Sequence, residues 1–164
     1  MTASKTPIPE GFHTVTASLI VSNAADAIEF YKKALGATEI MRMAGPDGKI
    51  GHAEIKIGDS IIFLSDEWPD MGAKSPQTLG GYTGAIYLYV PDVDAAYKRA
   101  VDAGAKATMP VSEMFWGDRH GQITDPYGHA WSISTHTQDY TQAEIEEGAK
   151  AWQAQMAQMH KKTA

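Results

Sequence analysis

Three side chains in the sequence are suited to chemistry, namely His52, Glu54 and His120. His52 and Glu54 are two residues apart, so both point to the same face if they lie on a β-strand. A neutral imidazole binds divalent metals and titrates near neutral pH, and a carboxylate beside it can be a further ligand or a general acid or base. The three residues indicate either a displaced metal site or acid/base pair, or hydrogen bonds to neighbouring strands or to a polar ligand.

The two histidines are related by an internal repeat. His120 follows His52 by 68 residues, and Gly104 follows Gly36 by the same number. Each glycine ends a helical pattern, as glycine often does after the last turn of a helix, and each histidine begins a strand pattern. A repeat of this length predicts that the two halves of the chain have the same fold.

The residue pattern of each half predicts the order strand, helix, strand, hairpin, strand. Asn23 and Asp92 are placed to cap the two helices, and turn residues at 58–60 and 125–128 precede the last strand of each half. We therefore expect an α+β fold of two tandem βαβββ modules that form a cupped mixed sheet. The expected bounds are 12–136 for a single domain, with module one at about 12–68 and module two at about 82–136.

The two ends of the chain lie outside this repeat. Residues 1–11 are expected to form a tail, and residues 141–162 an amphipathic C-terminal helix that starts with a capping box of Thr141 and Glu144. Its polar face mixes both signs of charge, so the helix is expected to pack on the domain or on a second subunit. Alternatively, the helix and Trp152 form a surface for a partner protein.

Composition excludes several classes of function. The 164 residues carry a net charge of −6 and no cluster of basic residues that would bind nucleic acid. Because the chain has no cysteine, a disulfide framework, a thiolate zinc site and a cysteine nucleophile are excluded. No apolar segment is long enough for a signal peptide or a membrane span, so a cytoplasmic location is expected.

Strand alternation sorts the remaining side chains into a core face and an inner face. If Leu19, Ile62 and Ile133 pack under the helices, the alternate residues point inward, and His52 and His120 face one cavity. The inner face is then rich in hydroxyl and aromatic groups. Besides the two histidines and Glu54, it includes Thr16, Phe63, Tyr87, Tyr89, Gln122, Ser132 and Ser134.

The roles of several residues near the last hairpin have two interpretations. Trp116 is suited to stacking on a planar ligand, or to a dimer interface. Asp118 and Arg119 could form an ion pair, or Arg119 could bind an anionic ligand. Trp131 is expected in the core and His129 in solvent.

Three motifs resemble the vicinal oxygen chelate (glyoxalase/bleomycin resistance protein/dioxygenase) superfamily, in its PhnB-like branch. They are Phe30-Tyr31-x-x-x-Leu35-Gly36, the stretch 51–60 and the Asp-Pro-Tyr-Gly turn at 125–128. The resemblance implies that each module forms half of a cup, with helices on the convex back and a ligand inside. The modules of this family pair within one chain or across a dimer, and both arrangements stay open here. Members include metal enzymes and metal-free binding proteins, and fold alone does not choose between them.

The resemblance also implies where metal ligands would stand. In metal-using members they lie on the first and last strands of each module, which places them here at Thr16, Phe63, Ala85 and Ser132. None of these is an imidazole or a carboxylate, which divalent transition metals prefer. The usual metal site is therefore expected to be absent.

The sequence thus predicts a homodimeric small-molecule-binding protein, metal-independent and without a cofactor, which holds an aromatic or apolar ligand with polar groups in its cup. The alternative is a lyase, isomerase or dioxygenase with Zn, Ni, Mn or Fe on His52, Glu54 and His120. No nucleic-acid or membrane partner is expected. The expected ligand-binding residues are His52, Glu54, Phe63, Tyr87, Tyr89, Trp116, His120, Gln122 and Ser132.

Overall fold

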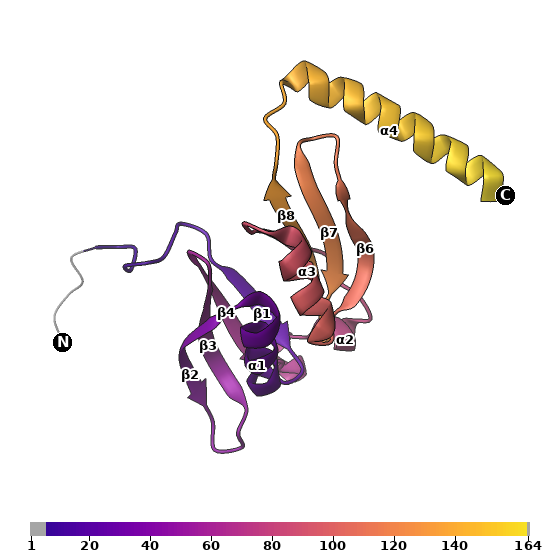
Figure 1. The fold of residues 1–164 in the computed structure, drawn as a ribbon. Helices are drawn as coiled ribbons and strands as arrows, with labels where there is room; N and C mark the ends of the chain where they lie inside the picture. Colours follow the sequence, from indigo (N-terminus) through magenta and orange to yellow (C-terminus); the bar gives the residue numbers. More distant parts are fainter. Residues whose placement is uncertain (1–5, 164) are drawn as a thin grey trace.

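A computed structural model describes residues 6–163 and folds each half of the chain into a βαβββ module (Figure 1). Module one contains β1 (Ala17–Val21), α1 (Ala24–Leu35), β2 (Thr38–Ala44), β3 (Ile50–Ile57) and β4 (Ser60–Asp66). Module two contains β5 (Ala85–Tyr89), α3 (Val93–Asp102), β6 (Lys106–Glu113), β7 (Asp118–Thr124) and β8 (Ala130–His136). The short helices η1 (Pro69–Met71) and α2 (Pro76–Leu79) lie between the modules, and α4 (Gln142–Thr163) follows them.

The two modules have the same sheet topology. The strands form two separate four-stranded sheets, with the order β1-β4-β3-β2 in module one and β5-β8-β7-β6 in module two. In each module the first strand along the chain pairs in parallel with the fourth (β1 with β4, and β5 with β8). The other strand pairs are antiparallel. The predicted α+β fold with tandem modules is confirmed.

Local capping chemistry sets where the two main helices begin and end. The side chain of Asn23 accepts a hydrogen bond from the amide of Asp26, and Asp92 accepts one from Ala95. Each cap satisfies an amide that has no partner inside the helix. Gly36 ends α1 in the left-handed conformation, with φ of 68°, which glycine adopts without the steric cost of a Cβ atom. These three predicted caps are confirmed, and the predicted Gly104 follows the C-cap residue Ala103 of α3 with φ of 115°.

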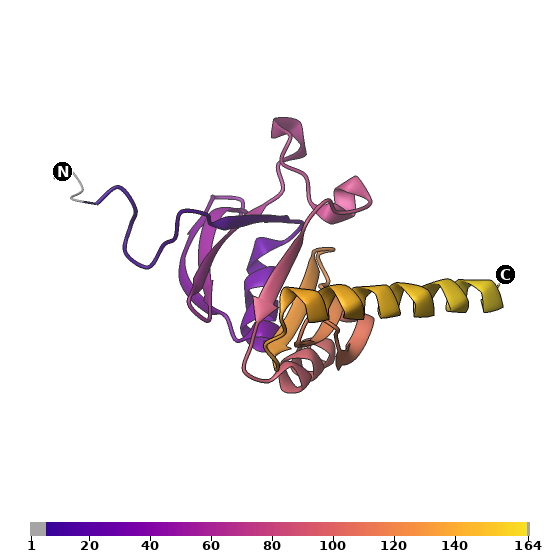
Figure 2. The same ribbon diagram turned by 90° about the horizontal axis from the view of Figure 1, so that it is seen from above.

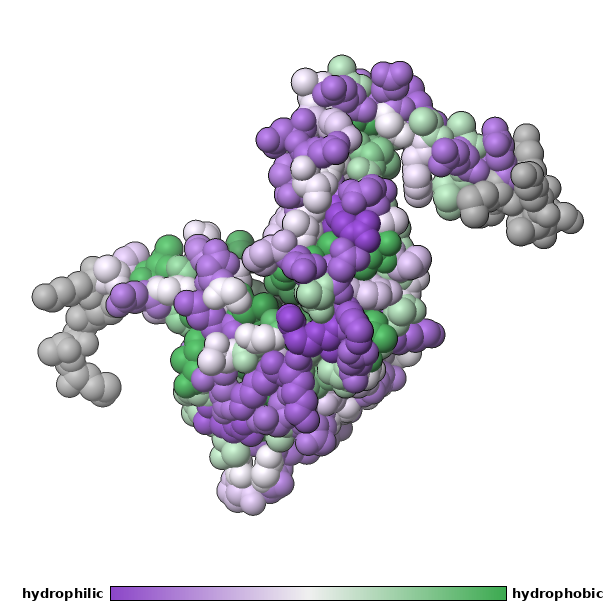
Figure 3. Space-filling model, in the orientation of Figure 1, coloured by the Kyte–Doolittle hydropathy of each residue, from purple (hydrophilic) through white to green (hydrophobic). Residues whose placement is uncertain are grey.

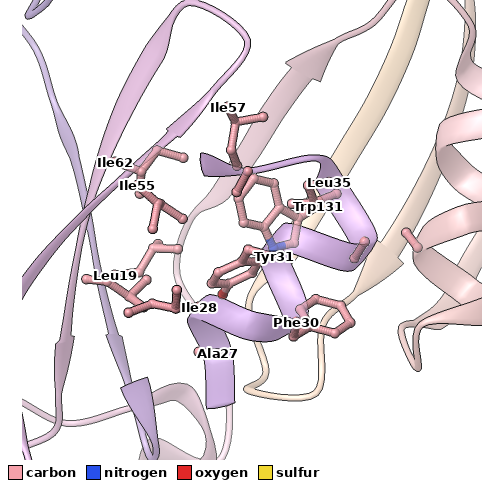
Figure 4. Packing of buried hydrophobic residues seen from close by; sticks show 14 of the residues in the cluster. Leu19, Ala27, Ile28, Phe30, Tyr31, Leu35, Ile55, Ile57, Ile62 and Trp131 are labelled. Carbon is pink, nitrogen blue, oxygen red and sulfur yellow. The ribbon is translucent and has the colours of Figure 1, made fainter. Parts of the chain in front are cut away.

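The helices α1 and α3 pack against each other and lie between the two sheets (Figure 1). Buried side chains of α1 therefore contact both its own sheet and module two, where Tyr31 lies against Trp131 with ring centroids 5.5 Å apart (Figure 4). Trp131 is 1% exposed, so its predicted place in the core is confirmed. The helix-free face of each sheet consequently lies on the side away from the α1–α3 contact.

Alternation along the strands follows the predicted pattern. The side chains on the helix side are buried or packed against the core, whereas Tyr87 and Tyr89 on the opposite face are exposed. The predicted core positions Leu19, Ile62 and Ile133 are confirmed. The same face also carries Val21, Ala53, Ile55, Ile57, Leu64, Ile86, Leu88 and Ile123, which are buried or packed against the core.

Polar contacts join the modules beside this core. The buried carboxylate of Asp125 accepts hydrogen bonds from Tyr31 Oη (2.7 Å) and Trp131 Nε1 (2.9 Å). His129 lies 3.0 Å through its Nε2 from the carbonyl oxygen of Ile20. His129, which was expected in solvent, is half-buried, because the turn after β7 carries its ring across to β1.

The C-terminal helix α4 starts at the predicted capping box. Thr141 Oγ1 accepts from the amide of Glu144, and the Glu144 carboxylate accepts from the amide of Thr141. The first half of α4 packs on the loop after β6, where Trp152 and Phe115 have ring centroids 6.1 Å apart. The second half extends beyond module two (Figure 2). Within residues 6–163 no helix is both long and apolar enough to cross a bilayer.

The surface in the view of Figure 3 is largely hydrophilic. Hydrophobic residues gather at the left edge of module one, beside the N-terminal segment, and where the two modules meet. One pocket lies under residues 7–14, and another lies between β1 and the segment before β5.

Candidate functional site

A buried carboxylate organises the helix-free face of module two. Asp118 is 1% exposed, and its Oδ2 accepts hydrogen bonds from Tyr87 Oη (3.1 Å), Tyr89 Oη (3.0 Å) and Trp116 Nε1 (3.1 Å). Its Oδ1 lies 2.8 Å from Nδ1 of His136. Four side chains from β5, the loop after β6 and β8 thus converge on one carboxylate, which we call the Asp118 hub.

A second set of contacts connects the hub to His120. The hydroxyl of Ser134 lies 2.7 Å from Tyr87 Oη and 2.8 Å from Nδ1 of His120. The His120 ring is stacked on Tyr87, with centroids 5.5 Å apart and planes 17° apart, and it meets the Trp116 ring edge to face at 5.7 Å. His120 is only 2% exposed, so these neighbours hold its ring in one orientation.

Strand pairing explains why these residues meet. Asp118 and His120 are two apart on β7, so both point to the face opposite α3. The register pairs His120 with Ser134 on β8, and Tyr89 with Ser134 across the β5–β8 pair. The site is therefore built on three adjacent strands instead of on loops.

The turn before β7 adds Trp116. Gly117 has φ of 95°, and a Cβ atom added there would lie 2.1 Å from the carbonyl oxygen of Gln138. Only glycine fits this turn, which orients the Trp116 indole toward the hub.

The hydrogen bonds shift the proton affinities of the groups in this network. Burial would raise the pKa of the Asp118 carboxyl, but hydrogen bonds from His136, Tyr89 and Tyr87 outweigh it and lower the pKa. The same bond to Asp118 raises the pKa of Tyr89 to about 12. Asp118 is therefore ionised at neutral pH, and Tyr89 keeps its proton.

The two histidines beside the hub are shifted in opposite directions. Burial lowers the pKa of His120, which favours the neutral ring. Hydrogen bonds to Asp118 and Asp139 raise the pKa of His136, whose ring is exposed. One imidazole is thus kept neutral and the other tends to be cationic.

The predicted residues of module one form a smaller group. His52 Nε2 lies 3.3 Å from Oε1 of Glu54, and the His52 ring meets Phe63 at 4.8 Å. Phe63 also contacts Phe12 of the N-terminal segment, with ring centroids 5.8 Å apart. Glu54, Phe63 and Phe12 line a pocket of about 530 Å³ under this segment.

The structure does not bring the two groups together within one chain. No hydrogen bond or ring contact of the described side chains joins His52 or Glu54 to His120. Among residues 6–158, whose side chains the structure describes, no three His, Asp or Glu side chains are close enough to hold a metal ion. Tyr87, Tyr89, Trp116 and His120 do meet, as a set.

Two further predicted residues lie next to the Asp118 hub. Ser132 and Gln122 are paired in register between β8 and β7, with Ser132 buried and Gln122 exposed. Neither takes part in the hydrogen bonds around Asp118. They extend the polar face toward the opposite end of the sheet.

Asp118 and His136 were not predicted as site residues. Alternation alone places Asp118 on the face of His120, and this signal was available in the sequence. Arg119 is one partner that the sequence suggests for Asp118, but the Arg119 guanidinium binds Asp94 at 2.7 Å and Glu113 at 3.2 Å. An Asp118–Arg119 ion pair is wrong, because neighbours on a strand point to opposite faces.

Comparison with known proteins identifies similar chains. Residues 11–133 match the model of the Glyoxalase/Bleomycin resistance protein/Dioxygenase superfamily. An uncharacterized protein of Mycobacterium tuberculosis is 44% identical over 131 residues, which cover 78% of this chain and 77% of that protein.

Solved structures show the same fold. Protein PA1353 from Pseudomonas aeruginosa is 26% identical, with a TM-score of 0.62, over 77% of this chain and 99% of that one. TioX from Micromonospora sp. ML1 is 23% identical, with a TM-score of 0.60, over 76% of this chain and 98% of its own.

Proposed function

Because this chain belongs to the Glyoxalase/Bleomycin resistance protein/Dioxygenase superfamily, we propose that it binds a small organic molecule against the helix-free face of module two. The observation that carries the proposal is the Asp118 hub, which fixes two tyrosines, a tryptophan and His136 around one carboxylate. Tyr87 and Tyr89 remain 45% and 62% exposed there. Rigid aromatic rings with a few fixed polar atoms are typical of small-molecule sites.

The proposed binding is independent of metal. The four positions at which the family resemblance places metal ligands carry a hydroxyl, a phenyl, a methyl and a second hydroxyl group, at Thr16, Phe63, Ala85 and Ser132. These groups do not fit a divalent transition metal, which takes imidazole, carboxylate or thiolate ligands. The donor chemistry of these side chains therefore supports a metal-free cup.

The proposed cup is completed by a second copy of the chain. The α1–α3 contact keeps the helix-free faces of the two modules from facing each other in one chain. A homodimer would place the His52, Glu54 and Phe63 face of one copy opposite the Tyr87, Tyr89 and His120 face of the other. Sedimentation is expected to give a dimer, and a monomer at high concentration would contradict this part of the proposal.

A thermal-shift screen of flat aromatic compounds tests the binding function. At least one compound is expected to raise the melting temperature of the wild type, and Tyr89→Ala should abolish the shift. Tyr82→Ala is the matched control, because Tyr82 is also an exposed tyrosine but lies in the segment before β5. Equal loss in both variants, or no stabilising compound, would contradict the proposal.

Metal analysis of the same protein separates this function from the enzyme alternative. The His52–Glu54 contact supplies two of the side chains that a metal would need. Stoichiometric Zn, Ni, Mn or Fe that is lost in His52→Ala and in His120→Ala would favour a lyase, isomerase or dioxygenase. Absence of metal from protein purified without chelators is the expected result.

A further inference from the structure

The charge of Asp118 fixes the direction of the hydrogen bonds around it. An ionised carboxylate accepts hydrogen bonds and donates none, and the indole N–H of Trp116 can only donate. The phenolic protons of Tyr87 and Tyr89 must therefore both point at Oδ2, at 3.1 and 3.0 Å. If Tyr87 turned its proton elsewhere, its oxygen would face the carboxylate without a proton between them.

The direction of the Tyr87 hydrogen bond in turn fixes the direction of the bonds from Ser134 and His120. Since Tyr87 has one proton and gives it to Asp118, it must accept at its 2.7 Å contact with Ser134. Ser134 therefore donates to Tyr87, and its single proton is used there. At the 2.8 Å contact between Ser134 and His120, the hydroxyl oxygen accepts and Nδ1 must carry the proton.

The other nitrogen of His120 is then left with a lone pair. A neutral imidazole carries one proton, and burial lowers the pKa of His120 and so favours the neutral form. Nε2 makes no hydrogen bond with a described residue. Since the described residues leave no fully buried side-chain nitrogen or oxygen unpaired, the Nε2 atom is not fully buried, although His120 as a whole is 2% exposed.

We propose that Asp118, acting through Tyr87 and Ser134, fixes His120 as its Nδ1–H tautomer, so that the bare Nε2 selects ligands with an O–H or N–H donor. This inference rests on the proposed function and names the class of ligand. The exposed ring of Tyr89, next to Tyr87 at 5.0 Å, favours a flat molecule. A phenol or an azole N–H meets both requirements.

Long-range ¹H–¹⁵N correlation spectra of the labelled full chain read the tautomer without any ligand. The His120 signals are assigned as those that disappear in His120→Gln. At neutral pH the wild type is expected to show a protonated Nδ1 and an unprotonated Nε2. A protonated Nε2, or an even mixture of tautomers, would overturn the inference.

Two matched tyrosine variants test the direction of the hydrogen bonds between Asp118 and His120. Tyr87→Phe frees the proton of Ser134, which should turn to Nδ1 and move the imidazole proton to Nε2. Tyr89→Phe removes a different donor to the same Oδ2 and should leave the tautomer unchanged. If Tyr87→Phe does not fold, Ser134→Ala removes the nearer acceptor of the Nδ1 proton and leaves only the Tyr87 oxygen at 3.3 Å, so it should increase the population of the Nε2–H form. An unchanged tautomer in Tyr87→Phe, or in Ser134→Ala where that variant replaces it, overturns the inference.

Phenol and anisole test the ligand class, because a methyl group replaces the only donor proton. Phenol is expected to shift the Nε2 resonance in a saturable titration. Anisole is expected to bind at least about fivefold more weakly than phenol. Equal affinity, or phenol that leaves Nε2 unshifted, overturns the selection. The tautomer is measured in the free protein, so failure of this inference is distinguishable from failure of the proposed function, in which no compound binds.

Discussion

Tyr31 of α1 donates a hydrogen bond of 2.7 Å to Oδ2 of Asp125, a residue 94 positions later in the turn between β7 and β8. Both residues are buried. Burial, followed by the charge of Asp125, raises the pKa of Tyr31, so the phenol remains a donor at any ordinary pH. This contact joins the two modules next to the shared aromatic core of Tyr31 and Trp131.

Removal of this hydroxyl should therefore destabilise the fold. Tyr31→Phe leaves the Asp125 carboxylate short of one charge-assisted donor, which is expected to cost about 1–3 kcal/mol. Urea denaturation measures the change. Tyr97→Phe is the control, since the Tyr97 hydroxyl makes no hydrogen bond to a described residue, and it should change stability by much less. Equal effects would show that the Tyr31–Asp125 bond is not stabilising.

The turn that carries Trp116 should tolerate only glycine at position 117. Gly117→Ala puts a Cβ atom onto the Gln138 carbonyl and forces an L-residue to φ of 95°, so it should lower stability by about 2 kcal/mol or more. Gly81→Ala is the control, because its Cβ meets nothing within 4 Å. Thermal unfolding of both variants checks the prediction, which fails if they are equally stable.

Stability should depend on pH through His136. Its hydrogen bonds to Asp118 and Asp139 raise its pKa in the folded protein above an unfolded value of about 6.5. The raised pKa means that the stabilisation is fully present below the unfolded pKa and is lost as pH rises through the folded pKa.

The difference in unfolding free energy between wild type and His136→Gln should therefore be largest at about pH 5 and decrease as the pH rises above the unfolded value of about 6.5. Urea unfolding over a pH series measures it. Asp139→Asn removes one of the two acceptors and should reduce the dependence. A difference that grows with rising pH would contradict the assignment.

Contact between α4 and the body of module two depends on a small residue at position 148. A Cβ atom added to Gly148 would lie 2.8 Å from Cβ of Phe115. Gly→Ala within a helix usually stabilises by about 1 kcal/mol, but Gly148→Ala should instead loosen α4. Amide hydrogen exchange along α4 measures this loosening as a loss of protection. Gly148→Ala in a Phe115→Ala background should regain the usual benefit, and protection of α4 that increases in the single variant would refute the close contact.

The local features of this protein follow from short stretches of its sequence. The caps at Asn23 and Asp92, the stop at Gly36 and the two-residue alternation of the strands depend on nearby residues, so the two βαβββ modules and their core faces could be predicted. The same alternation placed Tyr87, Tyr89 and His120 on one face, because the register of a parallel or antiparallel pair keeps side chains of a face together.

Which residues meet on those faces depends on how the two modules pack. Packing of α1 against α3 directs the helix-free faces of the two modules away from each other, so His52 and His120 do not meet in one chain. Only the folded arrangement shows that Asp118 is buried under four donors. Burial and hydrogen bonding between residues far apart in the chain are set by the whole packed structure, and no local pattern in the sequence encodes the protonation state that they impose on His120.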